Sequence, residues 1–247
     1  MIQLNDVVRT YGAKVAVAGL NLRIGAGELF AFLGPNGAGK TTTIKMIVGL
    51  LRPSSGSVRI CGHDVVTAPR KANSLLGFVP DEPYLYDKLS GREFLKFIAD
   101  MHGLPSDVGA DRIAREIANF NLSEFVDQLT ETYSHGMKQR VVFAGALLHD
   151  PAVLVLDEPM VGLDPRSMRL VKDLLRERAR AGMTIFMSTH TLAMAEEIAD
   201  RIGIVDRGGL TFVGSVEELR HQLSLSDKSL EQLYLELTSE ETRETAW

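Results

Sequence analysis

The chain has 247 residues, of which 45% are hydrophobic and 24% charged, and it carries a net charge of −5. This composition is that of a folded globular protein, and the length suits one large domain or a domain with an insertion. The acidic balance argues against nucleic acid as the main ligand, the single cysteine excludes an intramolecular disulfide, and no run of about 18 apolar residues is present to span a bilayer.

The first part of the chain predicts strands followed by one helix. The opening residues, MIQLNDVVRTYG, lack the apolar core of a secretion signal, and residues 2–8 and 15–24 alternate as half-buried strands do. Residues 29–33 are continuously apolar, which is typical of a strand buried on both faces. A glycine-rich loop follows, then residues 41–51 with apolar side chains at helical spacing, and residues 56–62 predict another short strand.

Residues 88–150 predict a mainly helical insertion into this β/α chain. Ser90 and Glu93 have the spacing of a capping box. The apolar residues after the cap fall on one face of the predicted helix; they are Phe94, Phe97, Ile98 and Met101. Residues 111–120 and 123–129 continue the helical pattern.

After residue 150, predicted strands and helices alternate. The predicted strands are 152–157, 184–189 and 201–206, the helices are 167–182 and 192–200, and a hairpin arm follows at 208–215. This alternation predicts an α/β fold with a mainly parallel sheet. The tail puts apolar side chains on one helical face that we expect to pack on the chain's own domain rather than on a partner. These residues are Leu230, Leu233, Tyr234 and Leu237.

The segment GPNGAGKT, which ends at Thr41, fits the phosphate-loop pattern G-x-x-x-x-G-K-[S/T]. Gly34, Gly37 and Gly39 allow backbone conformations that a side chain would forbid, so that N–H groups can surround an anion at a helix N-terminus. Lys40 would supply charge to the β- and γ-phosphates, and Thr41 a hydroxyl to Mg²⁺. The alternative is a glycine-rich turn with a surface lysine, but the flanking strand and helix favour a phosphate site.

Two acids leave the buried strand LVLDEP together. Because ligands of open α/β sheets bind at the carboxyl ends of strands, we expect Asp157 to partner Mg²⁺ and Glu158 to orient or deprotonate a water. His190 ends the next strand, where it can donate to a γ-phosphate oxygen and hold the attacking water. The alternatives are that the acids only end their strand, and that Ser188 or Thr189 at the end of His190's strand simply caps the following helix.

The segment YSHGMKQR, residues 133–140, offers a second anion site. Ser134 can supply a hydroxyl and a helix N-cap, Gly136 an unobstructed backbone amide, and the helix that follows a positive end. The sequence alone places no ligand there.

The motif order YG…GPNGAGKT…YSHGMKQR…VLVLDEP…GLDP…STH resembles the nucleotide-binding subunit of an ABC transporter over about residues 1–225. The segments TTTIKMIVGLLRPSSG and SLEQLYLELT are most similar to ATPases paired with ABC-2-type membrane subunits, usually exporters. The resemblance implies a P-loop NTPase (RecA-like) core, about 1–87 and 151–225, with an N-terminal antiparallel β subdomain. It also implies a helical insertion subdomain, about 88–150, and a C-terminal helical tail at 226–247.

The same resemblance implies ATP and Mg²⁺ as cofactors and hydrolysis of ATP to ADP and phosphate. It implies two partners, a second ATPase subunit in a homo- or heterodimer and transmembrane permease subunits, with no role for nucleic acid. The expected location is cytoplasmic, peripheral on the inner face of the cell membrane.

Site residues carry over by position. The phosphate loop, or Walker A motif, comprises Gly34, Pro35, Asn36, Gly37, Ala38, Gly39, Lys40, Thr41 and Thr42. Tyr11 matches the aromatic that stacks on adenine, Asp157 and Glu158 match Walker B and its catalytic glutamate, and His190 matches the switch histidine. Asp164 matches an aspartate at the dimer seam.

The segment YSHGM matches the signature motif, usually LSGGQ, through which one chain completes the ATP site of the other. Ser134 and Gly136, which contact the γ-phosphate, are kept, whereas Tyr133, His135 and Met137 replace leucine, glycine and glutamine. Whether the last two replacements weaken that contact is left open by the sequence.

Asp81 departs from the family pattern. The family usually has a glutamine after GFVP, where it contacts Mg²⁺ and the attacking water. A carboxylate near a triphosphate is repulsive unless the metal lies between them. Asp81 is therefore either a metal contact or a structural loop residue.

The loop after Asp81 carries Tyr84, Leu85 and Tyr86, which would suit either an interface with the membrane subunit or packing beneath the helical insertion. Two other functions compete with a transporter motor. An ABC-type ATPase acting on DNA or translation typically carries coiled-coil insertions or tandem domains, which are missing from this sequence. A small-molecule kinase would leave the signature segment, Glu158 and His190 without a role.

Overall fold

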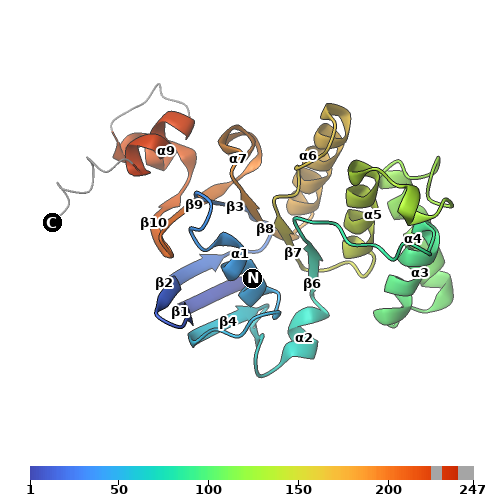
Figure 1. The fold of residues 1–247 in the computed structure, drawn as a ribbon, viewed down its shortest axis with the longest axis horizontal. Coiled ribbons are helices and arrows are strands. Elements are labelled where there is room, and N and C mark those ends of the chain that lie inside the picture. Colours follow the sequence, from blue (N-terminus) through green and yellow to red (C-terminus); the bar gives the residue numbers. More distant parts are fainter. Residues whose placement is uncertain (224–229, 239–247) are drawn as a thin grey trace.

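The computed structural model describes residues 1–223 and 230–238, and two β-sheets form its frame (Figure 1). The larger sheet has the strand order β10-β9-β3-β8-β7-β6. Its strands are β3 (Leu29–Leu33), β6 (Leu76–Val79), β7 (Val153–Asp157), β8 (Thr184–Thr189), β9 (Arg201–Asp206) and β10 (Gly209–Gly214). All neighbours are parallel except β9 and β10, which form the predicted hairpin. Every residue of β3 and β7 is buried, as their continuous apolar sequences predict.

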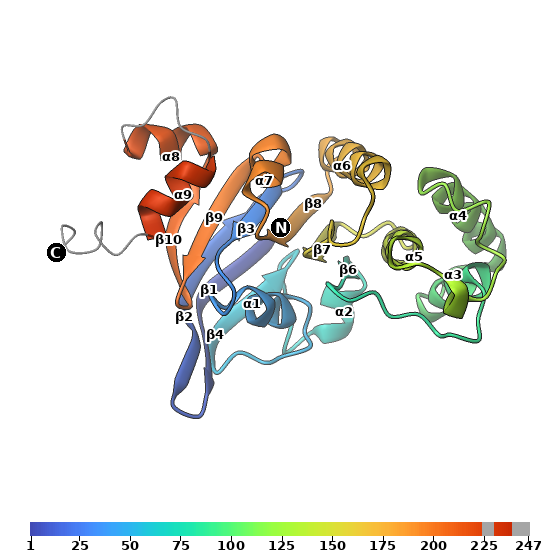
Figure 2. The same cartoon turned by 45° about the horizontal axis from the view of Figure 1, so that its top comes forward.

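The smaller sheet is antiparallel and confirms the predicted N-terminal β subdomain. Its order is β2-β1-β4-β5, with β1 (Ile2–Tyr11), β2 (Lys14–Ile24), β4 (Ser55–Ile60) and β5 (His63–Asp64). Helix α1 (Lys40–Ile47), which follows the phosphate loop, lies between this sheet and the larger one (Figure 2). Its Ile44 and Ile47 are fully buried in one cluster with Ile2 of β1 and Phe32 of β3. The helix that begins at the phosphate loop is therefore anchored in a core formed by both sheets.

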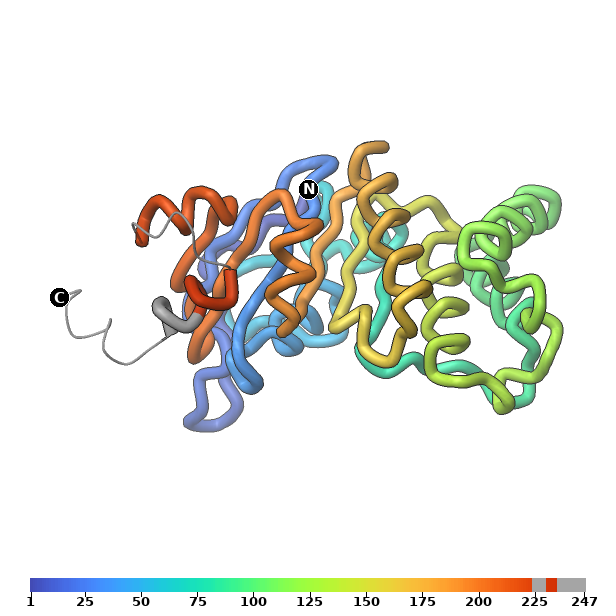
Figure 3. Tube along the Cα trace, turned by 90° about the horizontal axis from the view of Figure 1, so that it is seen from above, coloured from blue at the N-terminus to red at the C-terminus, as the bar shows by residue number. Residues whose placement is uncertain are grey.

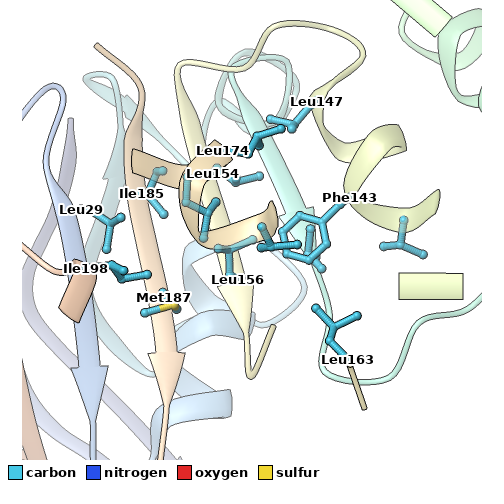
Figure 4. Packing of buried hydrophobic residues seen from close by; sticks show 14 of the residues in the cluster. Leu29, Phe143, Leu147, Leu154, Leu156, Leu163, Leu174, Ile185, Met187 and Ile198 are labelled. Atoms are coloured by element: carbon cyan, nitrogen blue, oxygen red, sulfur yellow. The ribbon is translucent and has the colours of Figure 1, made fainter. Parts of the chain in front are cut away.

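Helices α6 (Pro165–Arg180) and α7 (Leu192–Ile198) cover the opposite face of the larger sheet (Figure 2). Figure 4 shows this core at close range, with strand side chains packed against those of the helices. The labelled strand residues are Leu29, Leu154, Leu156, Ile185 and Met187, and Leu174 and Ile198 come from α6 and α7. This packing fixes the ends of β7 and β8, where the predicted acids and histidine lie.

The predicted insertion is helical and lies at one end of the molecule, opposite the C-terminal helices (Figure 3). It contains α3 (Gly91–Met101), α4 (Ser106–Asn119), the short 3-10 helix η1 (Thr130–Thr132) and α5 (His135–Leu147). The predicted capping box is present, because Ser90 accepts a hydrogen bond from the backbone of Glu93 and the Glu93 carboxylate accepts one from Ser90.

One prediction about the insertion is wrong, and the apolar face predicted for α3 is only partly buried. Residues 123–129 form turns rather than a helix, because the Val126 carbonyl accepts from Arg92 N–H at the start of α3 instead of from a later residue of its own segment. On α3, Phe97 and Met101 are 38% and 70% exposed, so they do not extend the buried face that Phe94 begins. The buried face continues instead through Leu95 and Ala99.

The remaining elements are α2 (Pro69–Asn73), α8 (Val216–Gln222) and α9 (Leu230–Thr238). The apolar face predicted for the tail packs on the chain's own domain, since Leu230 and Leu233 are fully buried in the cluster that includes α7. Leu237 lies outside the residues whose side chains are described. Among the residues that the structure describes, no helix has both the length and the apolar character that crossing a bilayer requires.

Candidate functional site

The phosphate loop joins β3 to α1, and its glycines serve two different purposes. Gly37 and Gly39 have φ values of 82° and 105°, the left-handed region predicted for them. Gly34 does not, but a Cβ there would lie 2.4 Å from the carbonyl oxygen of Val205. The reason for glycine at position 34 is therefore close backbone packing against β9, which the sequence did not reveal.

Lys40 opens α1 and folds back over the loop. Its Nζ donates to the carbonyl oxygens of Gly34 (2.6 Å) and Pro35 (3.2 Å), and the residue is 7% exposed. Burial lowers the pKa of Lys40, and the carboxylates of Glu158 and Asp157 partly oppose this shift. The ammonium group is thus held inside the loop on the side of the two acids.

Asp157 and Glu158 leave β7 beside the end of β8, as predicted. The side chain of Ser188, the residue paired with Asp157 across the two strands, donates to the Asp157 carboxylate at 2.5 Å. Burial raises the pKa of Asp157, the Ser188 and Thr41 hydrogen bonds lower it, and the nearby carboxylates of Asp81 and Glu158 raise it further. Three acids therefore crowd one small region.

Glu158 and His190 are in direct contact. Nδ1 of His190 donates to Oε2 of Glu158 at 2.9 Å, and the backbone N–H of His190 lies 3.3 Å from the same oxygen. Glu158 has a φ of 45°, and its own N–H donates to the carbonyl and hydroxyl oxygens of Ser188. The end of β8 thus fixes both the backbone and the carboxylate of Glu158.

The alternative that a residue before His190 caps helix α7 is only partly met. Thr191 is the N-cap and makes no side-chain capping bond, while Thr189 accepts a hydrogen bond from the Thr191 N–H. Ser188 bonds to Asp157 instead. The turn therefore positions His190 next to Glu158 and does little to cap the helix.

A cavity of about 410 Å³ brings ten of the predicted residues together, whereas Asp157 is outside its lining and His190 lines a neighbouring cavity with Glu158. The first of these cavities is lined by Tyr11, Lys14, Ala16, Pro35, Asn36, Gly37, Gly39, Lys40, Thr41, Thr42, Asp81 and Glu158. Gly34 and Ala38 support its floor through backbone groups, since the Gly34 carbonyl accepts from Lys40 and the Ala38 carbonyl from the Gly208 N–H. Such a cavity suits a nucleotide, with an exposed aromatic ring at one end and amides and a cation at the other.

Two lining residues were missed in the sequence. Lys14 and Ala16 come from β2 of the β1–β2 hairpin, where Lys14 pairs with Tyr11 and the Ala16 carbonyl lies close to Gly39 of the phosphate loop. A basic residue three positions after the aromatic was the available signal. Tyr11 is 48% exposed, and the guanidinium of Arg9 lies 4.7 Å from the ring centroid. Its second face remains free to stack on a base.

The signature segment lies apart from the cavity, since neither Ser134 nor Gly136 lines it. Ser134 is the N-cap of α5, and its hydroxyl accepts from the Met137 N–H at 3.3 Å. The replacement Tyr133 has a structural use: its hydroxyl accepts from Gly91 N–H and donates to the Phe125 carbonyl. The segment is therefore a separate helix N-terminus, as predicted.

Asp164 is also outside the cavity and caps α6. Its carboxylate accepts from the N–H groups of Arg166 and Ser167 and from the Ser167 hydroxyl. The Ser167 bonds hold the pKa of Asp164 below its usual value. These contacts explain the residue locally, without a partner chain.

The residues around Asp157 offer too few donors to hold a cation by themselves, so phosphate oxygens and waters would have to complete its coordination. In the described part of the chain, no group of three or more His, Cys, Asp or Glu side chains could hold a metal by itself. Thr41, Asp81 and Asp157 offer one hydroxyl and two carboxylates whose mutual repulsion a cation would relieve. Mg²⁺ fits this donor set, because it keeps several waters and takes phosphate oxygens as ligands.

Residues 17–161 match the family model described as "ABC transporter". The chain belongs to the ABC transporter family. This membership, with the P-loop and the α/β sheet, confirms the predicted P-loop NTPase fold, ATP binding and ATPase activity. It removes the small-molecule kinase from the competing functions.

Several relatives of this ABC ATPase are named as ATP-binding proteins. The linearmycin resistance ATP-binding protein LnrL of Bacillus subtilis (strain 168) is 37% identical over 90% of this chain and 72% of its own length. The daunorubicin/doxorubicin resistance ATP-binding protein DrrA of Streptomyces peucetius is 37% identical over 90% of this chain and 67% of its own. The ABC-type transporter ATP-binding protein EcsA of Bacillus subtilis (strain 168) is 32% identical over 98% of both chains.

Solved structures agree with this ABC ATPase assignment. An ATP-binding subunit of an ABC transporter superimposes with a TM-score of 0.92 at 32% identity, over 97% of this chain and 100% of its own. The dimeric ATP-binding cassette MJ0796, bound to ADP and phosphate after hydrolysis, superimposes with a TM-score of 0.77 at 25% identity, over 87% of this chain and 99% of its own. The chain is thus an ATP-binding subunit of the ABC transporter family, and the MJ0796 cassette that it resembles is a dimer.

Proposed function

We propose that two copies of this chain enclose two Mg·ATP and hydrolyse them to drive export through a permease in the cell membrane. The observation that carries the proposal is the cavity in which Tyr11, Lys40, Asp81 and Glu158 meet. Among the described residues, the signature segment contributes nothing to the cavity lining of its own chain, which leaves half of the expected ATP site to come from elsewhere. The helix N-terminus at Ser134 of a second copy supplies that missing half.

Binding of ATP is divided between the two ends of the cavity. Tyr11 covers one face of the adenine ring, and the amides of Gly37 and Gly39 with the Lys40 ammonium hold the phosphates. Lys40 is already desolvated among loop carbonyls, so phosphate oxygens replace those partners at little cost in hydration. Ser134 and Gly136 of the other copy contact the γ-phosphate.

Glu158 and His190 act on the attacking water. The water oxygen attacks the γ-phosphorus in line, the bond to the β–γ bridging oxygen breaks, and the Glu158 carboxylate accepts the proton of the water. Because Nδ1 of His190 donates to Glu158, the histidine holds the carboxylate in place. In the protonated ring, Nε2–H can donate to a γ-phosphate oxygen.

Thr41, Asp157 and Asp81 would hold Mg²⁺ beside the phosphates. The bound ion would neutralise charge on the β- and γ-phosphate oxygens. Ser188 keeps the Asp157 carboxylate oriented toward this region, and burial of Asp157 excludes bulk water from one side.

A groove between the core and the helical insertion would receive the membrane subunit. It has a volume of about 320 Å³, and its lining includes Leu50, Phe94, Ile98 and His102. Beside the groove, Tyr84 and Tyr86 are 75% and 47% exposed, whereas Leu85 is buried. The two tyrosines are therefore available for an interface with the membrane subunit, and Leu85 packs in the hydrophobic core. An amphipathic cytosolic segment of the permease fits this mixed apolar and aromatic surface, and its binding would place the chain on the inner face of the membrane.

Export is the direction that the relatives favour. LnrL and DrrA are named for resistance to linearmycin and to daunorubicin and doxorubicin, and another relative is a Nod factor export ATP-binding protein of Burkholderia orbicola (strain AU 1054). Removal of a toxic compound or release of a secreted one is outward transport. We extend that direction, and no particular cargo, to this chain.

The test of the proposed function is Glu158→Gln. The substitution keeps the size of the side chain and removes the proton acceptor, so ATP binding should persist while hydrolysis falls at least about 100-fold. ATP-dependent dimers should accumulate, measurable by size-exclusion chromatography with and without ATP. Hydrolysis at the wild-type rate would remove Glu158 from the mechanism.

A further inference from the structure

The feature that the proposed function leaves unused is the side chain of His135. This residue stands where the family usually has glycine, one position after Ser134. Its Nε2 donates to the carbonyl oxygen of Val161 at 3.1 Å. Val161 belongs to the loop 158–164, which begins with Glu158 and ends with Asp164. A side chain of the signature segment is thus bonded to the loop that starts at the water-activating residue of the same chain.

Both the loop 158–164 and the first turns of α5 contribute to the contact between His135 and Val161. Gly162 has a φ of 74°, and a Cβ at that position would lie 2.3 Å from Cδ2 of His135, so the imidazole ring rests directly on the Gly162 backbone. A Cβ at Gly136 would lie 3.4 Å from the Gly162 carbonyl oxygen, which shows that the first turn of α5 follows the same loop. One turn later, Nε2 of the fully buried Gln139 lies 3.4 Å from the Pro159 carbonyl oxygen.

Backbone hydrogen bonds within the loop 158–164 link Val161 to Glu158. The loop is closed by two short-range bonds, Val161 N–H to the Glu158 carbonyl and Leu163 N–H to the Met160 carbonyl. Glu158 sits at its start in a left-handed conformation, which the Ser188 contacts maintain. A shift of Val161 therefore acts on a backbone that has few alternative conformations.

We propose that His135 is a positioning residue that couples the two ATP sites of the dimer. The inference rests on the proposed function, in which Ser134 and Gly136 serve the partner's ATP and Glu158 serves the chain's own. Through the bond to Val161, engagement of the signature segment by the partner's γ-phosphate sets the position of Glu158 in the opposite site. A glycine at position 135 has no such bond, so this link belongs to chains with a donor side chain there.

The test compares His135→Leu with His135→Gln in the full chain, by steady-state hydrolysis against ATP concentration. Leucine removes the donor but keeps bulk, and glutamine places an N–H donor at the same distance along the side chain as Nε2 of histidine. We expect His135→Leu to lower kcat roughly threefold to tenfold, the effect of one hydrogen bond, with little change in KM. Coupled sites should give the wild type a sigmoidal dependence on ATP concentration, and His135→Leu should make it hyperbolic. His135→Gln should restore both kcat and the sigmoidal curve.

The same change at the exposed His221 of α8, His221→Leu, is the control and should leave kcat and curve shape unaltered. Equal impairment of His135→Leu and His135→Gln, wild-type kinetics in His135→Leu, or a hyperbolic wild-type curve would each overturn the coupling role. Ser134→Arg separates this inference from the proposed function. If Ser134→Arg loses hydrolysis while His135→Leu has normal kinetics, the coupling through His135 is refuted and the proposed function stands. If Ser134→Arg hydrolyses ATP normally, the proposal that two chains share each ATP site is refuted.

Discussion

Neighbouring residues hold both the backbone and the side chain of Glu158 in one conformation. A left-handed conformation costs a non-glycine residue of the order of 1 kcal/mol or more, and here Ser188 of β8 holds the backbone N–H while His190, just after β8, holds the carboxylate. The fully buried strands β7 and β8 supply the stability that maintains this conformation. The carboxylate is therefore oriented by residues of its own chain.

Asp81 gives a prediction at the same scale. Its carboxylate is near enough to raise the pKa of Asp157, so it belongs to the acid cluster and lines the cavity. Asp81→Gln should increase the Mg²⁺ concentration for half-maximal hydrolysis roughly fivefold, equal to about 1 kcal/mol, because one attractive charge is lost. Binding of ATP without Mg²⁺ should strengthen, since the carboxylate no longer repels the phosphates. A Mg²⁺ titration of hydrolysis measures the first effect and equilibrium binding with a chelator the second.

For Asp81, unchanged Mg²⁺ dependence and unchanged turnover in Asp81→Gln would show that the carboxylate is only a structural part of its loop. A suitable control is the adjacent Glu82→Gln, since Glu82 is also exposed and acidic but does not line the cavity. It should leave the Mg²⁺ titration unaltered.

Most cavity residues could be predicted from sequence because their spacing reflects backbone requirements. Gly37, Gly39 and Lys40 follow from a left-handed loop that opens a helix, and Glu158 from an acid at the end of a buried strand. The role of Gly34 could not, because Val205 approaches it from a strand that lies 205 − 34 = 171 residues later in the chain. For the same reason the Ser188 bond to Asp157 required knowledge of which strands are neighbours.

At the scale of elements, prediction succeeded where a segment's own pattern decides its structure and failed where a neighbour decides it. The capping box at Ser90 is local and is present. Residues 123–129 have a helical pattern, but their carbonyl groups serve the start of α3. Met101 fits the apolar face of α3 by spacing and is nevertheless 70% exposed, because α3 ends beside the groove rather than beneath another helix.

A pair of stacked histidines at the ends of α3 and α5 predicts that the stability of the fold depends on pH. His102 follows α3 and His149 follows α5, and their rings stack with centroids 3.8 Å apart. Burial, together with the charge of His102, lowers the pKa of His149 to about 4. The pKa of His149 in the unfolded state is about 6.5, so between pH 6.5 and pH 4 the unfolded state binds more protons than the folded state. The contribution of His149 to stability is therefore fully present above pH 6.5 and is lost as the pH falls toward 4.

We expect this histidine to account for about 2 kcal/mol of the loss, after discounting the full shift for solvent screening. In His149→Gln the amide keeps the donor to the Leu76 carbonyl but cannot gain a proton. Urea unfolding at pH 7 and pH 4.5 should therefore show a smaller difference in the variant than in the wild type. An equal difference in both proteins would show that His149 does not bind a proton on unfolding.

At the scale of the whole molecule, the groove joins segments that are far apart in the sequence, since Leu50, Phe94 and His149 all line it and Tyr86 packs on Phe94. Leu50 follows α1 and lines the groove, Tyr84 follows β6 and packs against Tyr86, and Met101 ends α3 next to His102, which lines the groove. Their exposure, 69%, 75% and 70%, is unusual for such large apolar side chains. A binding partner would explain why the surface keeps them.

The double variant Tyr84→Ser and Met101→Ser tests this surface. Co-expressed with its permease, the wild-type chain should sediment with the membrane fraction, and the variant should shift mainly to the supernatant, because it loses apolar area worth about 1–3 kcal/mol. Val108→Ser, an exposed apolar residue of α4 outside the groove, is the control and should sediment as the wild type does. Full retention of the double variant on the membrane would place the contact elsewhere.

The central claim is that each ATP site combines residues of two chains, and mixing two inactive variants tests it most directly. Glu158→Gln lacks the proton acceptor but has an intact signature segment, whereas Ser134→Arg has the reverse defect. A mixed dimer then contains one site with Glu158 from one chain and Ser134 from the other. We predict that the mixture hydrolyses ATP well above either variant alone. A mixture as inactive as its components would show that Ser134 and Glu158 do not act on the same ATP.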